Sequence, residues 1–124
     1  MRPLAIAAAL LLAGSANPAP GPSTALVKET AGRIAGPARS CVSTISSENL
    51  RVIDQMTLAY GTGTTVYINH LPGPCPGLSQ FNTLIVEVQG GQYCRGDHVR
   101  GNEPGSIIPG PACNLGDWVL YRRR

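Results

Sequence analysis

The sequence predicts an all-β domain, a small antiparallel barrel or sandwich of about six short strands with two disulfides. Three observations lead to this prediction. Glycine and proline account for 15 and 11 of the 124 residues, which favours turns over long helices. From Ser40 onward, short runs of alternating apolar and polar residues lie between turn residues, as in half-buried strands. Four cysteines, Cys41, Cys75, Cys94 and Cys113, fall in this same region.

The first segment, residues 1–16, has the pattern of a secretory signal peptide. A positive start at Arg2 precedes an uncharged apolar run from Leu4 to Ala13, and small residues follow. As a helix, this run would cover only about 15 Å, which is half of the hydrocarbon core of a membrane. We therefore expect cleavage after Ala16 and export to the periplasm or the medium, with no membrane span in the mature chain.

Residues 17–39 have the composition of a linker. They are rich in Ala, Pro, Gly and Ser and contain no aromatic residue, which is typical of flexible connecting chain. One or two helical turns around Leu26 and Ile34 would be too short to persist alone in water. The β domain is then expected to span residues 40–124.

Six strands are expected in this domain. Strict alternation places Val52, Met56 and Leu58 on one face of the second strand. Gly90-Gly91 predicts a tight hairpin loop between the fourth and fifth strands. The expected strands cover residues 41–45, 51–60, 64–70, 82–88, 93–99 and, near the end, 117–121.

The four cysteines are expected to form two disulfides. An even number of cysteines in an exported chain favours disulfides, and no C-x2-C pair is present to hold zinc. Three pairings are possible. In an up-and-down meander, Cys41 and Cys94 would lie at one end of the sheet and Cys75 and Cys113 at the other. The favoured pairing is therefore Cys41–Cys94 with Cys75–Cys113, although a crossover connection would change it.

The charge distribution argues against a nucleic-acid partner. The net charge is +3, but from Ser40 onward six basic residues are balanced by six acidic ones. A nucleic-acid-binding protein needs a basic face. Three of the basic residues are Arg122, Arg123 and Arg124, which we interpret as a solvated end, with adhesion to an anionic surface as the alternative.

Asp54 is the most informative polar residue. Alternation places its carboxylate on the apolar face with Val52 and Leu58, where a charge is costly unless it is hydrogen-bonded. One interpretation is a bulge or bend at this point, with the side chain accepting backbone N–H groups. The other is a functional carboxylate in a cleft.

Asp97 and His98 are weaker candidates. A nucleophilic triad needs a serine or cysteine beside a histidine that a carboxylate orients. The sequence has no G-x-S-x-G elbow, and the thiols are expected in disulfides. His70 and His98 lack the spacing of metal ligands on one element. We therefore expect surface histidines, no catalytic residue, no cofactor and no metal.

A series of short motifs runs from Ser40 to Tyr121. They are Ser40-Cys41-Val42, Val52-Ile53-Asp54, Thr57-Leu58, Val66-Tyr67-Ile68-Asn69, Cys75-Pro76-Gly77-Leu78, Cys94-x-x-Asp97 and Cys113-x-Leu115-Gly116. In this order they resemble a family of small exported or lipid-anchored proteins of Gram-negative bacteria, a domain of unknown function. The resemblance implies a location in the cell envelope, although this chain lacks a cysteine for a lipid anchor.

Three functional hypotheses follow. The first is a non-enzymatic module that binds a protein or another envelope component. The second is a small metal-dependent or acid/base enzyme, which would need Asp54, Asp97 and His98 to meet in one pocket. The third is a secreted enzyme inhibitor that presents the loop from Gly101 to Pro111 as a preformed contact surface.

Overall fold

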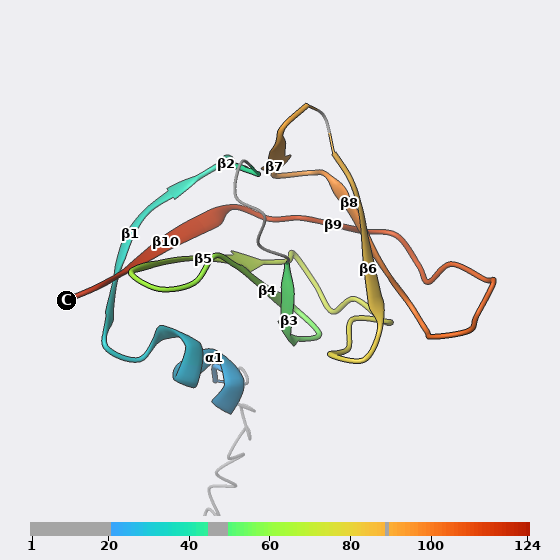
Figure 1. The fold of residues 1–124 in the computed structure, drawn as a ribbon, viewed down its shortest axis with the longest axis horizontal. Helices are drawn as coiled ribbons and strands as arrows, with labels where there is room; N and C mark the ends of the chain where they lie inside the picture. The colour runs from blue at the N-terminus through green and yellow to red at the C-terminus, as the bar shows by residue number, and fades with distance from the viewer. Residues whose placement is uncertain (1–20, 45–49, 89) are drawn as a thin grey trace, which may run out of the picture.

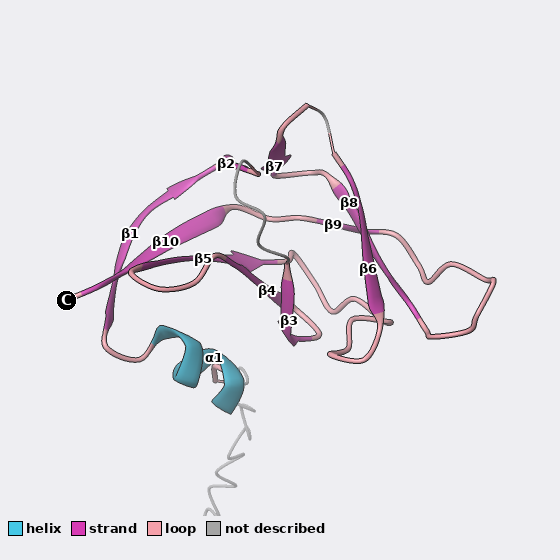
Figure 2. Ribbon diagram, viewed as in Figure 1, coloured by secondary structure: helices cyan, strands magenta, loops and turns pink. Residues whose placement is uncertain are grey.

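A computed structural model describes residues 21–44, 50–88 and 90–124. The predicted signal peptide, residues 1–16, lies outside these ranges. Within them, no helix has the length and apolar character needed to cross a membrane. Figures 1 and 2 show how the short helix α1 lies beside the strands that make up most of the fold. The elements of the described chain are α1 (Thr24–Thr30), β1 (Arg33–Arg39), β2 (Cys41–Ser43), β3 (Arg51–Asp54), β4 (Thr57–Tyr60), β5 (Thr65–His70), β6 (Thr83–Glu87), β7 (Gln92–Cys94), β8 (His98–Asn102), β9 (Cys113–Asn114) and β10 (Trp118–Arg123).

Five strands form the main sheet, in the order β1-β10-β5-β4-β3, and every pair is antiparallel. All four residues of β4 are buried, because this strand has a strand on each side and packing on both faces. β3 is the outer strand at one edge of the sheet, and β1 is the outer strand at the other.

The two faces of the main sheet carry separate apolar clusters. Trp118 and Leu58, both with no exposed surface, belong to the larger cluster. The other face carries Ala59, Val66 and Ile68, which are also buried. Leu26 of α1 packs against this second cluster, so the short helix covers a face that would otherwise be apolar and open to water.

Two smaller sheets cover the larger cluster. β2 pairs with β7, and β8 lies between β6 and β9. The disulfide Cys41–Cys94 joins residues directly opposite each other in β2 and β7, and Cys75–Cys113 joins a loop to β9. The prediction of a mostly β, antiparallel fold with these two disulfides is confirmed.

The predicted linker, residues 17–39, is wrong for its C-terminal part. Residues 24–30 form α1, and β1 pairs with β10 from Arg33, opposite Arg123, to Arg39, opposite Trp118. Composition suggested a linker because the strand contains Gly36 and Pro37, which are unusual in strand interiors. Both residues lie at an outer strand, where the register shifts between Ala35 and Ala38, so the irregularity is tolerated.

Two of the predicted strands are also different in the structure. Residues 51–60 form a hairpin, β3–β4, rather than one strand, because the Asp54 side chain caps a tight turn at Gln55-Met56. Residues 93–99 are interrupted by a turn at Gly96, whose φ of 87° favours glycine.

The Gly90-Gly91 hairpin is wrong as well, because β7 pairs with β2 and β6 pairs with β8. β6 and β7 therefore belong to different sheets and do not pair with each other as a hairpin.

Candidate functional site

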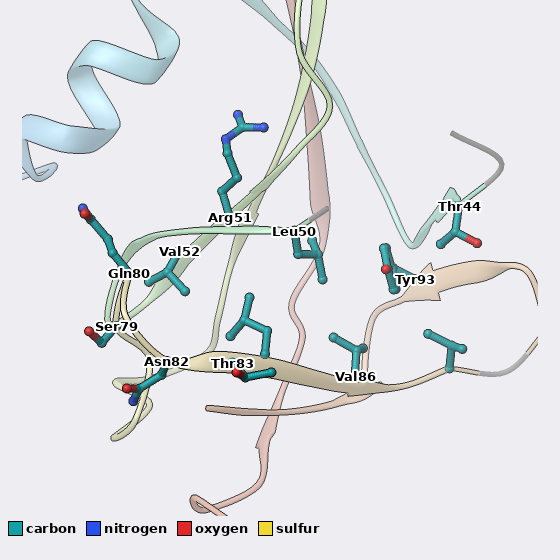
Figure 3. Close-up of a pocket in the computed structure, with 12 residues that line it drawn as sticks. Thr44, Leu50, Arg51, Val52, Ser79, Gln80, Asn82, Thr83, Val86 and Tyr93 are labelled. Atoms are coloured by element: carbon teal, nitrogen blue, oxygen red, sulfur yellow. The ribbon is translucent and has the colours of Figure 1, made fainter. Parts of the chain in front are cut away.

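An open groove of about 730 Å3 lies between β3 and β6. Figure 3 shows Leu50 and Val52 on one side of the groove and Val86 pointing toward them from β6. Tyr93 lies at one end, and Ser79 lies at the other. The full lining, here called the β3–β6 groove, is Thr44, Leu50, Arg51, Val52, Ser79, Gln80, Asn82, Thr83, Leu84, Val86, Val88 and Tyr93.

The floor of the β3–β6 groove is apolar and belongs to the main core. Leu50, Val52, Leu84, Val86 and Tyr93 are half-buried and pack against the larger cluster. Every second residue of β6 contributes, since its exposure alternates along the strand. This period of two is the strand periodicity that sequence reasoning detected, but only the tertiary structure shows that these side chains line a groove.

Tyr93 closes one end of the groove with a neutral hydroxyl group. Burial raises the pKa of Tyr93, and the nearby Tyr60 raises it further. The Tyr93 ring packs edge-on against Tyr60, with 5.5 Å between ring centroids, and it stacks on Trp118 at 6.3 Å. The ring position is therefore set by the core, and the hydroxyl remains protonated at neutral pH.

Arg51 is the charged residue of the groove lining, and its guanidinium group already has partners. Nη1 donates to the carbonyl oxygen of Gly61 at 2.8 Å, and Nη2 forms an ion pair with Glu29 of α1. Sequence reasoning missed Arg51 because no local pattern connects it with Glu29, which is 22 residues earlier in the chain. Among the described residues that line it, the groove therefore offers apolar surface and neutral polar groups rather than free charge.

Asp54 holds the β3–β4 turn and the start of α1. Its Oδ1 accepts a hydrogen bond from the Met56 backbone N–H at 2.9 Å, and its Oδ2 accepts one from the Ser23 hydroxyl at 2.6 Å. Ser23 is in turn the N-cap of α1. Burial raises the pKa of Asp54, but hydrogen bonds from Ser23, Met56 and Thr57, with the nearby His70, outweigh it and lower the pKa overall. These contacts are the bend with backbone bonding that the sequence suggested, and sequence reasoning missed Ser23.

The sign of this pKa shift predicts how the stability depends on pH. The ionised form of Asp54 is favoured in the folded protein, so its contribution is full above the unfolded pKa, near 3.8, and is lost as the pH falls through the lower folded pKa. We expect Asp54→Ala to cost about 1 kcal/mol at neutral pH and progressively less in acid, measured by urea denaturation across pH. A loss of stability that stays constant into acid would contradict this account. We expect Ser23→Ala to cause part of the stability loss that Asp54→Ala causes at neutral pH.

Asp97 has a comparable structural role in a different turn. Its Oδ2 accepts the Cys94 backbone N–H at 2.7 Å, and its own N–H donates to the Cys94 carbonyl oxygen at 3.0 Å. His98 is exposed in β8, opposite Glu87 and Asn114. The cavity beside Asp54 contains His70 but neither Asp97 nor His98. Among the residues that the structure describes, no three His, Cys, Asp or Glu side chains are grouped to hold a metal.

The loop between β8 and β9 presents two isoleucines to solvent. Ile107 is 98% exposed and Ile108 is 75% exposed. The Ser106 N–H donates to the Glu103 carbonyl oxygen at 3.1 Å, and the loop ends at the disulfide-bonded Cys113. This loop, at the right of Figure 1, has internal hydrogen bonds and an exposed apolar tip.

Comparison of the chain with protein-family models, with curated proteins and with solved structures gives no match. The family resemblance noted in the sequence therefore stays a prediction.

Proposed function

We propose that this protein is an exported, non-enzymatic binding module that holds an extended segment of a partner protein in the β3–β6 groove. The observation that carries the proposal is the apolar floor of this groove beside the outer strand of the main sheet. The separate positions of Asp54 and Asp97 support a binding role over a catalytic one. The two disulfides and the apolar segment at residues 4–13 support export.

The shape of the groove favours an extended peptide. Leu84, Val86 and Val88 follow each other at every second position, so their side chains repeat at about 7 Å, which matches alternate side chains of an extended chain. Among the described residues, β3 has a strand partner on one side only. Since no described strand pairs with its other edge, we expect the backbone of a bound peptide to pair there, as in β-strand addition.

To test this, peptides that bind the oxidised protein are selected from a phage-displayed library of random linear peptides. The selected peptides are then synthesised, and their affinity is measured by calorimetry. Val88 lines the groove and is 45% exposed, whereas Ile85, 42% exposed on the same segment, does not line it. We expect Val88→Asp to weaken binding about tenfold or more, because it places a charge against the apolar ligand, and Ile85→Asp to leave the affinity within about twofold.

Two further results would separate this proposal from its rivals. Methylation of alternate backbone nitrogens in the winning peptide should abolish binding if the main chain pairs with β3. If Ile107→Asp weakens binding and Val88→Asp does not, the exposed loop is the contact surface, as the inhibitor hypothesis requires, and the groove proposal fails. It also fails if no selected peptide is sensitive to Val88→Asp.

A further inference from the structure

A second cavity, of about 630 Å3, lies where α1, the start of β1 and the end of β10 meet. Figure 1 shows the end of β10 beside the start of β1, with α1 below them. Arg122 and Arg123 are exposed, as expected of a solvated end, but they belong to β10. Backbone hydrogen bonds from Arg123 to Thr64 at 2.9 Å and from Arg124 to Gly32 at 3.3 Å hold this segment in place.

Positive charge is concentrated in this cavity. Lys28, Arg33, Arg123 and Arg124 line it and are here called the basic pocket. Glu29 is the acidic residue of the lining, and it already forms an ion pair with Arg51. Arg33 and Arg123 stand directly opposite each other in β1 and β10, an arrangement of like charges that destabilises a strand pair. The fold therefore holds four cationic side chains around one cavity whose described lining has a single acidic side chain, Glu29.

Arg33 also has an unused hydrogen-bond donor. Its Nη1 is buried and has no hydrogen-bond partner among the described residues. Among the described residues, the other buried donor without a partner is the indole nitrogen of Trp118. The Trp118 side chain has no exposed surface and lies in the closed core. Arg33, by contrast, lines an open cavity. The enclosed Nη1 is therefore not the atom that faces this cavity, and a ligand there would meet the remaining part of the Arg33 guanidinium group.

We propose that the basic pocket binds a phosphate group through Arg33, with Lys28, Arg123 and Arg124 balancing its charge. Arginine matches phosphate oxygens with paired N–H donors. The four cationic side chains of the described lining outnumber its one acidic side chain, which favours a dianion over a single carboxylate. This site is separate from the β3–β6 groove and does not depend on the function proposed for it. The phosphate can come from a soluble phosphate or from a lipid headgroup.

Arg122 provides a matched control for Arg33. It adjoins Arg123 in β10 but does not line the basic pocket, so Arg122→Gln removes the same charge from the same end of the molecule. The first arm titrates the oxidised protein with inorganic phosphate, using calorimetry and the shift of Tm, at constant ionic strength. We expect Arg33→Gln to weaken phosphate binding about tenfold, the loss of one charge-assisted hydrogen bond, and Arg122→Gln to change it by no more than about twofold.

A structural role for Arg33 gives a different result. In buffer without phosphate, we expect Arg33→Gln to have a Tm equal to or above that of the parent, because the variant removes an unpaired buried donor and a like-charge pair. A lower Tm for Arg33→Gln in that buffer, together with no Tm shift of the parent on adding phosphate, would assign Arg33 to the fold and overturn the proposal.

The second arm uses phosphatidylglycerol–phosphatidylcholine vesicles in phosphate-free buffer and measures co-sedimentation. If Arg33→Gln reduces vesicle binding more than Arg122→Gln does, the phosphate source is a lipid headgroup. If only the titration with inorganic phosphate depends on Arg33, the source is soluble. If Arg33→Gln and Arg122→Gln behave alike in both arms, the positive charge acts diffusely and the proposed site does not exist.

Discussion

Reduction of both disulfides is expected to unfold this protein at room temperature. Cys41–Cys94 and Cys75–Cys113 close loops with sequence separations of 53 and 38. Each should contribute about 4 kcal/mol by restricting the unfolded chain, whereas small domains have a total stability of about 5–15 kcal/mol. Loss of both crosslinks therefore removes most of the stability. Far-UV and near-UV circular dichroism before and after addition of a reductant measures the effect.

The two disulfides should not be equivalent. Cys75 has no exposed surface and belongs to the larger apolar cluster, whereas Cys41 and Cys94 are half-buried in a short strand pair. We expect the Cys75→Ala/Cys113→Ala variant to lose more stability than Cys41→Ala/Cys94→Ala, because the first also leaves a gap in the core. Free thiols in a natively isolated protein that is still folded would contradict this account.

Replacement of Asn69 by leucine is expected to cost about 3 kcal/mol, although the two side chains are similar in size. Asn69 is fully buried in β5. Its Nδ2 donates to the Gly116 carbonyl oxygen and its Oδ1 accepts the Gly116 N–H, each at 2.8 Å. Leucine would leave two buried backbone groups without partners, and each such group is costly. Urea denaturation should show the loss, and Tm should fall by more than about 10 °C.

Asn114 provides the control for this measurement. It is exposed in β9, so we expect Asn114→Leu to change the stability by no more than about 0.5 kcal/mol. If Asn69→Leu is as stable as Asn114→Leu, the hydrogen bonds to Gly116 do not stabilise the fold. The contact also explains Gly116 itself, since a Cβ atom there would lie 2.1 Å from the His70 carbonyl oxygen.

The disulfide pairing was predicted correctly from a strand order that is wrong. The prediction assumed consecutive strands paired as a meander, whereas the main sheet runs β1-β10-β5-β4-β3 and β7 pairs with β2. The pairing survives because Cys41 and Cys94 need only be brought to neighbouring positions, which the β2–β7 register does directly. The end of the sheet at which each cysteine was expected to lie was sufficient to predict the disulfide pairing, but it did not predict the order of the strands.

Asp54 and Asn69 illustrate how far the candidate sites could be predicted. The alternation around Asp54 required either a bend or a buried charge, and the bend is present with the backbone bond to Met56. Asn69 gave no such signal, because a polar residue in a strand is ordinarily expected on the exposed face. Its partner, Gly116, is 47 residues away, and nothing local in the sequence indicates that contact. Nothing local in the sequence indicates the basic pocket either, because Arg33 and Arg123 are brought together only by the pairing of β1 with β10.

Local chemistry in the sequence by itself indicated that this chain is mostly β and where several of its turns fall, and it favoured the observed cysteine pairing over the two alternatives. These features depend on side-chain periodicity, on turn residues and on parity, all of which are readable over a few residues or by counting. Only the tertiary structure decided which strands are neighbours, that β1 completes the main sheet, and that a groove and a basic pocket exist. Backbone hydrogen bonds are the same for every strand pair, so the choice of partner depends on how side chains far apart in the sequence pack together.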